Sequence, residues 1–298
     1  MITGIKGSRL RKAAAVAVTT GALLTTGALT AAPAQAVTKP SIVAKGGFVM
    51  NNATGTSLFT KAADTRRSTG STTKIMTAKV VLAQPNLNLD TKVTIPKGAS
   101  DYIVANNASS AGLIVGDKVT VRQLLYGLML PSGCDAAYVL ADKFGSGSTH
   151  TARVNSFLGK MNAAAKSLKL TNTHFDSFDG IGKGSNYSTP RDLTKIASSA
   201  MKNSTFRSIV KTKSYKAKTT TKTGSTRTMK AWTNTNTLLS NYSGTIGVKT
   251  GSGPEAKYCL VFAATRNGKT VIGTVLASTS VAQRESDAKK LLNYGFAK

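Results

Sequence analysis

Apolar residues recur along the chain with two different periods. Between residues 66 and 239 most apolar runs have helical spacing, as in 75–82 and 121–128. Pro85 and Pro131 follow these two runs and predict where the helices end. Short runs of strand type occur at 47–59 and again at 245–276. We therefore expect an α/β (α+β) fold, in which both chain ends build one antiparallel sheet and a mostly helical lobe is inserted.

Further elements follow from shorter signals. Residues 153–168 and 283–294 have the composition of helices, and Thr189-Pro190 is typical of a helix start. The dipeptide Asn267-Gly268 predicts a hairpin turn between two of the C-terminal strands. The stretch 211–230 is rich in lysine and threonine, and we expect it to be strand-biased and exposed.

The first 36 residues have the composition of a secretory signal. A basic start is followed by a small-residue apolar core and by Ala34-Gln35-Ala36, which has the form of a cleavage site. We expect a signal peptide at 1–36 and one mature domain at 37–298, with a sheet lobe at about 37–65 and 240–298 and a helical lobe at about 66–239. The mature protein is expected to be secreted and extracytoplasmic.

The formal net charge is +28. Such a charge could indicate a nucleic-acid partner, but the signal and the scatter of the basic residues argue against one. Contact with anionic wall polymers or lipid headgroups, or a merely solvated surface, accounts for the charge equally well.

Cysteine and histidine are too few to predict a framework. Cys134 and Cys259 could form one bridge, which the sequence leaves open. His150 and His174 have no ligand-like spacing with them, so neither a metal nor another cofactor is expected.

Ser71 and Lys74 stand three residues apart at the start of an apolar-periodic run. Residues i and i+3 are neighbours on a helix, so the lysine could take the serine proton and create a nucleophile. The spacing alone is weak, because it recurs at 199/202, 208/211 and 286/289.

Two other stretches carry candidate chemistry. Ser132-Gly133-Cys134 follows Pro131, on a tight connection between two predicted helices, where side chains can project into a cleft. Lys249-Thr250-Gly251 ends a predicted strand, where a lysine and a hydroxyl can hold a substrate carboxylate and a glycine admits substrate backbone. The same tripeptide occurs at 222–224, but Lys249 is preferred because hairpin strands follow it.

The three stretches occur in the order of the Ser-x-x-Lys, Ser-x-Asn and Lys-Thr-Gly motifs. With Phe-Asp-Gly at 178–180, the chain resembles the low-molecular-mass penicillin-binding proteins, the serine D-alanyl-D-alanine carboxypeptidases and transpeptidases, over residues 42–298. It resembles most the small actinomycete transpeptidases with Ser-Gly-Cys. The resemblance implies a β-lactamase/transpeptidase-like fold and a monomer that acts on peptidoglycan stem peptides, uses amine acceptors and is inhibited by β-lactams.

The resemblance also implies a role for each residue. Ser71 would attack the penultimate D-alanine, Lys74 would take its proton, and Ser132 with Lys249 would assist the leaving group. Thr250 would bind the terminal carboxylate. Cys134, Gly251 and Ser252 would complete the substrate site, with the backbone N–H groups of Ser71 and Ser252 as the oxyanion hole.

Cys134 departs from the family's Asn. A thiol hydrogen-bonds weakly, so we expect a free thiol lining the cleft and mainly transpeptidation, with Cys134 as an inert buried residue or a bridged one as the alternative. Three other functions are weighed: a β-lactamase, a Ser-His-Asp hydrolase and a non-catalytic basic wall-binding module. The β-lactamase is disfavoured because Glu255 and Glu285 both lie outside the context of a deacylating glutamate.

Overall fold

The structure is a computed structural model that describes residues 37–182 and 184–298. Residues 37–298 form one compact unit. The predicted signal peptide at 1–36 lies outside the described residues. The division of the mature chain into two lobes with the boundaries given above stays a prediction.

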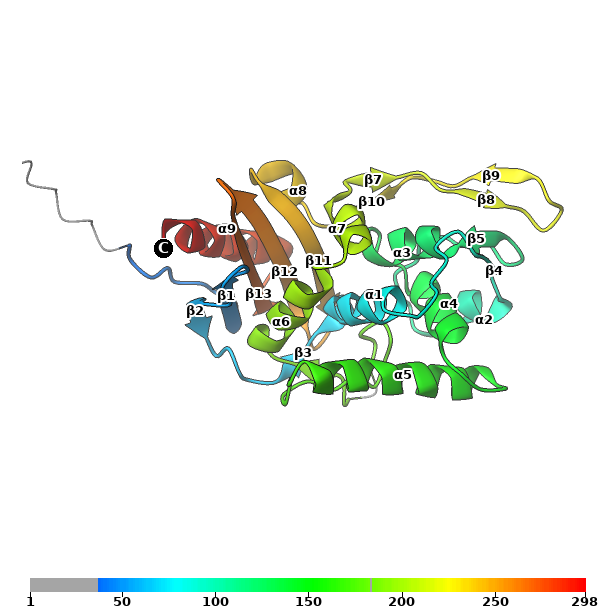
Figure 1. Ribbon diagram of the computed structural model, residues 1–298, viewed down its shortest axis with the longest axis horizontal. Helices are drawn as coiled ribbons and strands as arrows, with labels where there is room; N and C mark the ends of the chain where they lie inside the picture. Colours follow the sequence, from blue (N-terminus) through cyan, green and yellow to red (C-terminus); the bar gives the residue numbers. More distant parts are fainter. Residues whose placement is uncertain (1–36, 183) are drawn as a thin grey trace, which may run out of the picture. The chain divides into compact units, whose positions relative to one another are not determined.

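A five-stranded antiparallel sheet combines the two ends of the described chain (Figure 1). Its order is β11-β12-β13-β1-β2, with β1 (Gly46–Asn51) hydrogen-bonded to β13 and the predicted hairpin to β2 formed. The remaining bounds are β2 Ser57–Lys61, β11 Thr245–Gly253, β12 Lys257–Arg266 and β13 Lys269–Ser278. The expectation of one sheet from both chain ends is confirmed.

Alternation along the strands gives this sheet two buried faces. Val49 and Phe262 belong to the cluster that contains the last helix, α9 (Val281–Ala297). Their neighbours Phe48 and Val261 belong to the larger cluster that contains α6 (Pro190–Ala200). Because side chains point alternately to opposite faces of a strand, the sheet lies between α9 and the helical part of the chain.

The helical part surrounds a central helix, α1 (Lys74–Leu82), which contacts α3, α4, α5, α6 and α7. A short 3₁₀ turn, η1 (Gly70–Thr73), leads into it. The helix ends three residues before Pro85, as predicted, but it is buried on nearly every side. The other bounds are α2 Lys97–Ala105, α3 Val121–Met129, α4 Cys134–Phe144, α5 His150–Ser167, α7 Ser204–Lys211 and α8 Leu238–Asn241.

Short strands complete the fold. A four-stranded sheet has the order β4-β5-β8-β9, and two pairs, β3 with β6 and β7 with β10, hold loops together. The bounds are β3 Arg67–Ser68, β4 Lys92–Thr94, β5 Lys118–Thr120, β6 Tyr187–Ser188, β7 Ser214–Tyr215, β8 Lys218–Thr220, β9 Thr226–Thr228 and β10 Trp232–Thr233. The stretch 211–230 is thus largely strand and exposed, as its composition predicts. No helix among the described residues is long and apolar enough to cross a membrane.

Candidate functional site

Ser71 and Lys74 come together where η1 passes into α1. The Lys74 ammonium donates to Ser71 Oγ over 2.8 Å and to the backbone oxygen of Asp179 over 3.2 Å. Lys74 is fully buried, whereas Ser71 is partly exposed. The pair therefore has a solvent-accessible hydroxyl backed by an amine in a water-poor interior.

Ser132 lies in the connection between α3 and α4, as expected. Its backbone has a φ of +66°, a left-handed conformation that is uncommon for a residue with a Cβ. Ser109 Oγ donates to its carbonyl oxygen over 2.6 Å, which helps to hold this conformation. The Ser132 hydroxyl is buried and has no hydrogen-bond partner among the described residues. Buried hydroxyls are normally paired, so this one is available to a bound molecule.

Cys134 is the first residue of α4, and its thiol lies beside the lysine. Lys74 Nζ donates to Cys134 Sγ over 3.2 Å. Burial raises the pKa of the Cys134 thiol, although the Lys74 charge opposes this effect. Cys134 and Cys259 are both free, so the expectation of a free thiol holds and the bridge that the sequence left open does not form.

Lys249 and Lys222 differ sharply in environment. Lys249, on β11, is fully buried, and desolvation holds its pKa well below the ordinary value, with a further lowering by the Lys74 charge. Its Nζ donates to the backbone oxygen of Thr250 over 3.1 Å. Lys222 is exposed between β8 and β9. The structure therefore brings Lys249 to Ser71 and Lys74 and leaves the second Lys-Thr-Gly at the surface.

Two glycines allow β11 to lie against η1. A Cβ on Gly251 would come within 2.8 Å of the Thr69 carbonyl oxygen and 3.0 Å of the Thr72 nitrogen. A Cβ on Gly70, whose φ is +48°, would meet the backbone of Ser252 at 2.8–3.2 Å. The absence of both side chains lets the backbones next to Ser71 and Ser252 approach each other closely.

These residues meet at one cavity of about 770 Å³. Ser71, Ser132, Cys134, Thr250, Gly251 and Ser252 line it, and Lys74 and Lys249 are buried behind them. Three segments far apart in the sequence, η1, the α3–α4 connection and β11, thus supply one wall each. No Asp or Glu is among the described residues that line this cavity.

Other residues of the cavity were not predicted from the sequence. Arg284 of α9 lines it, and its Nη1 donates weakly to the backbone oxygens of Gly251 and Cys259 at 3.5 and 3.4 Å. Burial lowers the pKa of the Arg284 guanidinium. Thr235 shares a 2.6 Å hydrogen bond with the Thr250 hydroxyl. Neither residue stands in a motif, so only the fold reveals them.

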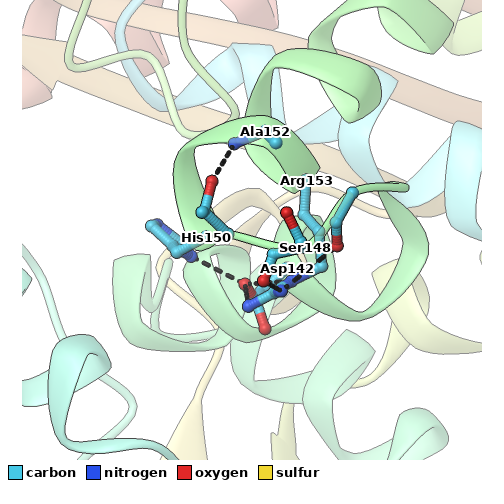
Figure 2. A network of polar contacts seen from close by, with 7 residues as sticks. Asp142, Ser148, His150, Ala152 and Arg153 are labelled. Carbon is cyan, nitrogen blue, oxygen red and sulfur yellow. Dashed lines mark hydrogen bonds and ion pairs between the residues drawn. The ribbon is translucent and has the colours of Figure 1, made fainter.

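A second polar cluster tests the Ser-His-Asp hypothesis. In Figure 2, His150 points toward Asp142, and its Nδ1 lies 2.7 Å from Asp142 Oδ1. The ring stacks on Tyr138, and Arg153 also binds Asp142. Among the residues that the structure describes, no hydroxyl hydrogen-bonds to the His150 ring. The cluster therefore ties α5 to α4 and lacks the nucleophile of a triad.

The fold and the three-walled cavity define a serine acyl-enzyme class, and the comparisons identify the family. The chain belongs to the D-alanyl-D-alanine carboxypeptidase family, whose family model matches residues 33–280, and it is thus a serine-type penicillin-binding protein. The resemblance drawn from the motifs and the transpeptidase-like fold are confirmed. This family of cell-wall enzymes acts on the D-alanyl-D-alanine ends of peptidoglycan.

Individual relatives give the same picture. The chain is 78% identical to a D-alanyl-D-alanine carboxypeptidase from Streptomyces sp. strain K15, over 97% of this chain and 99% of that one. The crystal structure of the Streptomyces K15 DD-transpeptidase matches with a TM-score of 0.87 and 81% identity, over 88% of this chain and all of that one. The carboxypeptidase DacD from Francisella tularensis is 28% identical, with a TM-score of 0.76 over 88% and 72%.

Proposed function

We propose that this protein is mainly a DD-transpeptidase, with some DD-carboxypeptidase activity, that works through an acyl-enzyme on Ser71. The observation that carries the proposal is the 2.8 Å contact between Lys74 Nζ and the accessible Ser71 hydroxyl at the cavity. In the first step Ser71 Oγ bonds to the carbonyl carbon of the penultimate D-alanine. The C–N bond to the terminal D-alanine then breaks, and the leaving amine takes a proton.

The surroundings of Lys74 suit a general base. A neutral amine has two N–H groups and one lone pair. Cys134 Sγ and the Asp179 carbonyl can accept the two N–H groups, and Ser71 Oγ–H can donate to the lone pair. All three partners are therefore satisfied when the amine is uncharged, which is the form that can remove the serine proton.

Ser132 and Lys249 serve the leaving group in this proposal. The unpaired Ser132 hydroxyl can donate to the leaving nitrogen and be resupplied from the Lys74 side of the cavity. Lys249, whose low pKa reflects its desolvation, lies on the same wall and favours negative charge there when protonated. Thr250 and Arg284 offer a hydroxyl and a guanidinium to the terminal carboxylate.

The oxyanion formed on the carbonyl oxygen would sit between the backbone N–H groups of Ser71 and Ser252. Their neighbours Gly70 and Gly251 permit the close approach that such a pair needs. A single donor of this kind typically lowers the barrier by about 3–4 kcal/mol. The acyl ester then passes to an amine, which cross-links two stem peptides, or to water.

Transfer to an amine is favoured over hydrolysis. The cavity has no carboxylate among its described lining residues, so no obvious base prepares a water molecule. Glu285 is held outside the cavity by Thr237 and Asn241, which disfavours a class A β-lactamase mechanism. β-Lactams are expected to acylate Ser71 and to leave slowly.

The remaining proposals concern the setting of the reaction. Because the substrate is peptidoglycan, the mature chain is placed outside the cytoplasmic membrane, after removal of residues 1–36 as a signal peptide. It acts as a monomer, since all residues of the site come from one chain. Its basic surface gives peripheral contact with anionic material there, and no nucleic acid is a partner.

The experiment is acylation of mature protein by a fluorescent penicillin, followed by mass spectrometry of the adduct. The label should fall on the peptide with Ser71, and Ser71→Ala should abolish it while Ser199→Ala, which has the same lysine spacing, keeps it. An adduct on another serine would overturn the assignment. Product analysis with a D-alanyl-D-alanine donor, with and without glycylglycine, should show mainly transfer when the amine is present.

A further inference from the structure

The four-stranded sheet β4-β5-β8-β9 has a solvent face with an unusual composition. Three of its strands have the sequences Lys-Val-Thr, Lys-Val-Thr and Lys-Thr-Thr, and the fourth is Thr-Arg-Thr. In each strand the outer two residues point to one face and the middle residue to the other, because side chains alternate. One face therefore carries only lysine and threonine.

The strand register turns this composition into an ordered array. Thr94, Lys118, Thr220 and Thr226 form one continuous rung across all four strands. The neighbouring positions on the same face are Lys92, Thr120, Lys218 and Thr228. Lys92 Nζ donates to Thr220 Oγ1 over 3.0 Å, which shows directly that these side chains share a face. We name this array the Lys/Thr face, with Lys92, Lys118 and Lys218 as its lysines.

The opposite face of the same sheet is occupied. Val119 is buried and Val93 packs against the main core. Thr219 and Arg227 both bind the buried carboxylate of Asp117, at 3.0 and 3.1 Å. The sheet is thus fixed by its inner face. No packing or charge-pairing role is left for the Lys/Thr face among the described residues.

Protection of sheet edges does not account for the lysines. A lysine on an edge strand prevents pairing with another chain, and Lys92 on the edge strand β4 fits that role. Lys118 and Lys218, however, lie on the two central strands β5 and β8. A different reason is needed for their exposed positive charge.

The surrounding charge is one-sided. The chain contains no acidic residue between Asp192 and Glu255, a stretch that includes both β8 and β9. Further exposed basic residues, Lys216 and Lys222, follow the same hairpin. Asp90 lies next to β4, but it is paired with Arg122 at 3.3 Å. The face therefore has an uncompensated positive field with hydroxyl donors between the charges.

We infer that the Lys/Thr face binds a linear polyanion with phosphodiester groups, of the kind attached to cell walls. Ammonium and hydroxyl groups repeat along the strands at roughly 7 Å and across them at about 5 Å. Both groups donate to phosphate oxygens. Such contact would hold the enzyme at the wall that carries its substrate, so the inference rests on the proposed extracytoplasmic function.

The alternatives have less support from this face. Insertion into a membrane needs apolar or aromatic side chains, and the face and the 221–225 turn have none. Binding of single-stranded nucleic acid commonly uses aromatic platforms, which are also lacking here. A purely electrostatic, diffuse attraction would involve all surface lysines equally, and this is the main competitor that the experiment must separate.

The test uses mature full-length protein and purified poly(glycerol phosphate) in a binding titration at several salt concentrations. The variant Lys92→Gln/Lys118→Gln/Lys218→Gln removes the three lysines of the face. Its matched control, Lys143→Gln/Lys166→Gln/Lys202→Gln, removes three exposed lysines from the helical part. We expect the first variant to lose tenfold or more in affinity and to flatten the log–log salt dependence by about 2, at ~0.7 per lost contact. The control should keep most of the affinity.

Equal losses in the two variants would overturn the inference and leave only diffuse attraction. Preference for anionic phospholipid vesicles, with the same dependence on the three lysines, would overturn the choice of partner. Acylation by penicillin in solution should be unchanged in both variants, because none of the six lysines lines the cavity. Loss of acylation in wild type would instead refute the proposed function, and it is measured separately.

Discussion

At the scale of single residues, the thiol of Cys134 is the most informative position. It lies 3.2 Å from Lys74 Nζ and is held by α4, so it occupies the place where the family's Asn would reach substrate. Burial keeps its pKa raised, and the group is therefore an uncharged, weakly hydrogen-bonding thiol at neutral pH. Positioning of a water molecule beside the acyl ester loses a strong polar partner there.

We predict that Cys134→Asn raises the ratio of hydrolysis to transfer. An amide donates and accepts strongly, so it can hold a water molecule, and one hydrogen bond of about 1 kcal/mol corresponds to about fivefold in the ratio. Product analysis with a fixed amine concentration measures it. Cys259→Ala, a change at the other buried thiol, should leave the ratio unaltered. An unchanged ratio in Cys134→Asn with intact acylation would show that the thiol does not control acceptor choice.

Lys249 carries a cost in stability. Its folded-state pKa lies well below 10.5, so the folded chain binds fewer protons than the unfolded chain between those two values. The cost is present in full below the folded-state pKa and disappears as the pH rises toward 10.5. A residue retained despite such a cost is typical of a functional site.

We therefore predict that Lys249→Met stabilises the fold at pH 7 by about 1 kcal/mol while it abolishes most acylation. The gain should shrink as the pH approaches 10.5, where the wild-type lysine is neutral in both states. Urea unfolding at several pH values and labelling with penicillin measure the two effects. Lys222→Met, at the exposed copy of the tripeptide, should change neither. A loss of stability at neutral pH would contradict the account of Lys249.

At the scale of elements, the site depends on how closely β11 approaches η1. The approach distance is set by backbone and not by long side chains, since Gly251 faces Thr69 and Thr72 directly. Gly253 is two residues further on the same strand, yet a Cβ there would meet nothing closer than 3.9 Å. The two positions form a matched pair for the effect of one methyl group.

We predict that Gly251→Ala lowers the rate of acylation at least tenfold, because the strand must move away and separate the backbones of Ser71 and Ser252. The free energy of unfolding should fall by about 1–3 kcal/mol, as for other overpacked sites. Gly253→Ala should stay within about twofold of wild type in rate. Stopped-flow acylation and urea unfolding provide the measurements, and equal behaviour of the two variants would refute this role for Gly251.

The elements also show how far sequence reasoning reaches. The three motifs, the capped helix after Thr120 and the C-terminal hairpins follow from local patterns, and the structure contains them. Helix α2, helix α7 and the strands β4 and β5 were not predicted, because they are short and their pattern depends on partners distant in sequence. Arg284 and Thr235 reach the cavity only through the packing of α9 and the loop before α8.

At the scale of the whole molecule, the five-stranded sheet must be closed by strands from opposite ends of the chain. Asp287 of α9 joins these ends, since it accepts the backbone N–H groups of Val43 and Ala44 at 3.1 and 2.7 Å. It also accepts from Gln283 Nε2 at 2.9 Å and is fully buried. One carboxylate thus satisfies two N–H groups just before β1 and fixes them to the last helix.

We predict that Asp287→Asn lowers the free energy of unfolding by about 3 kcal/mol. An amide can accept through one oxygen only, so at least one buried N–H group faces another donor and loses its partner. Asp101→Asn, which breaks only the exposed pair with Lys97, should cost less than about 1 kcal/mol. Because Asp287 does not line the cavity, the folded fraction of the variant should acylate at the wild-type rate below its melting temperature. A variant with wild-type stability would mean that the two chain ends are held together by the strand pairing of β1 with β13 alone.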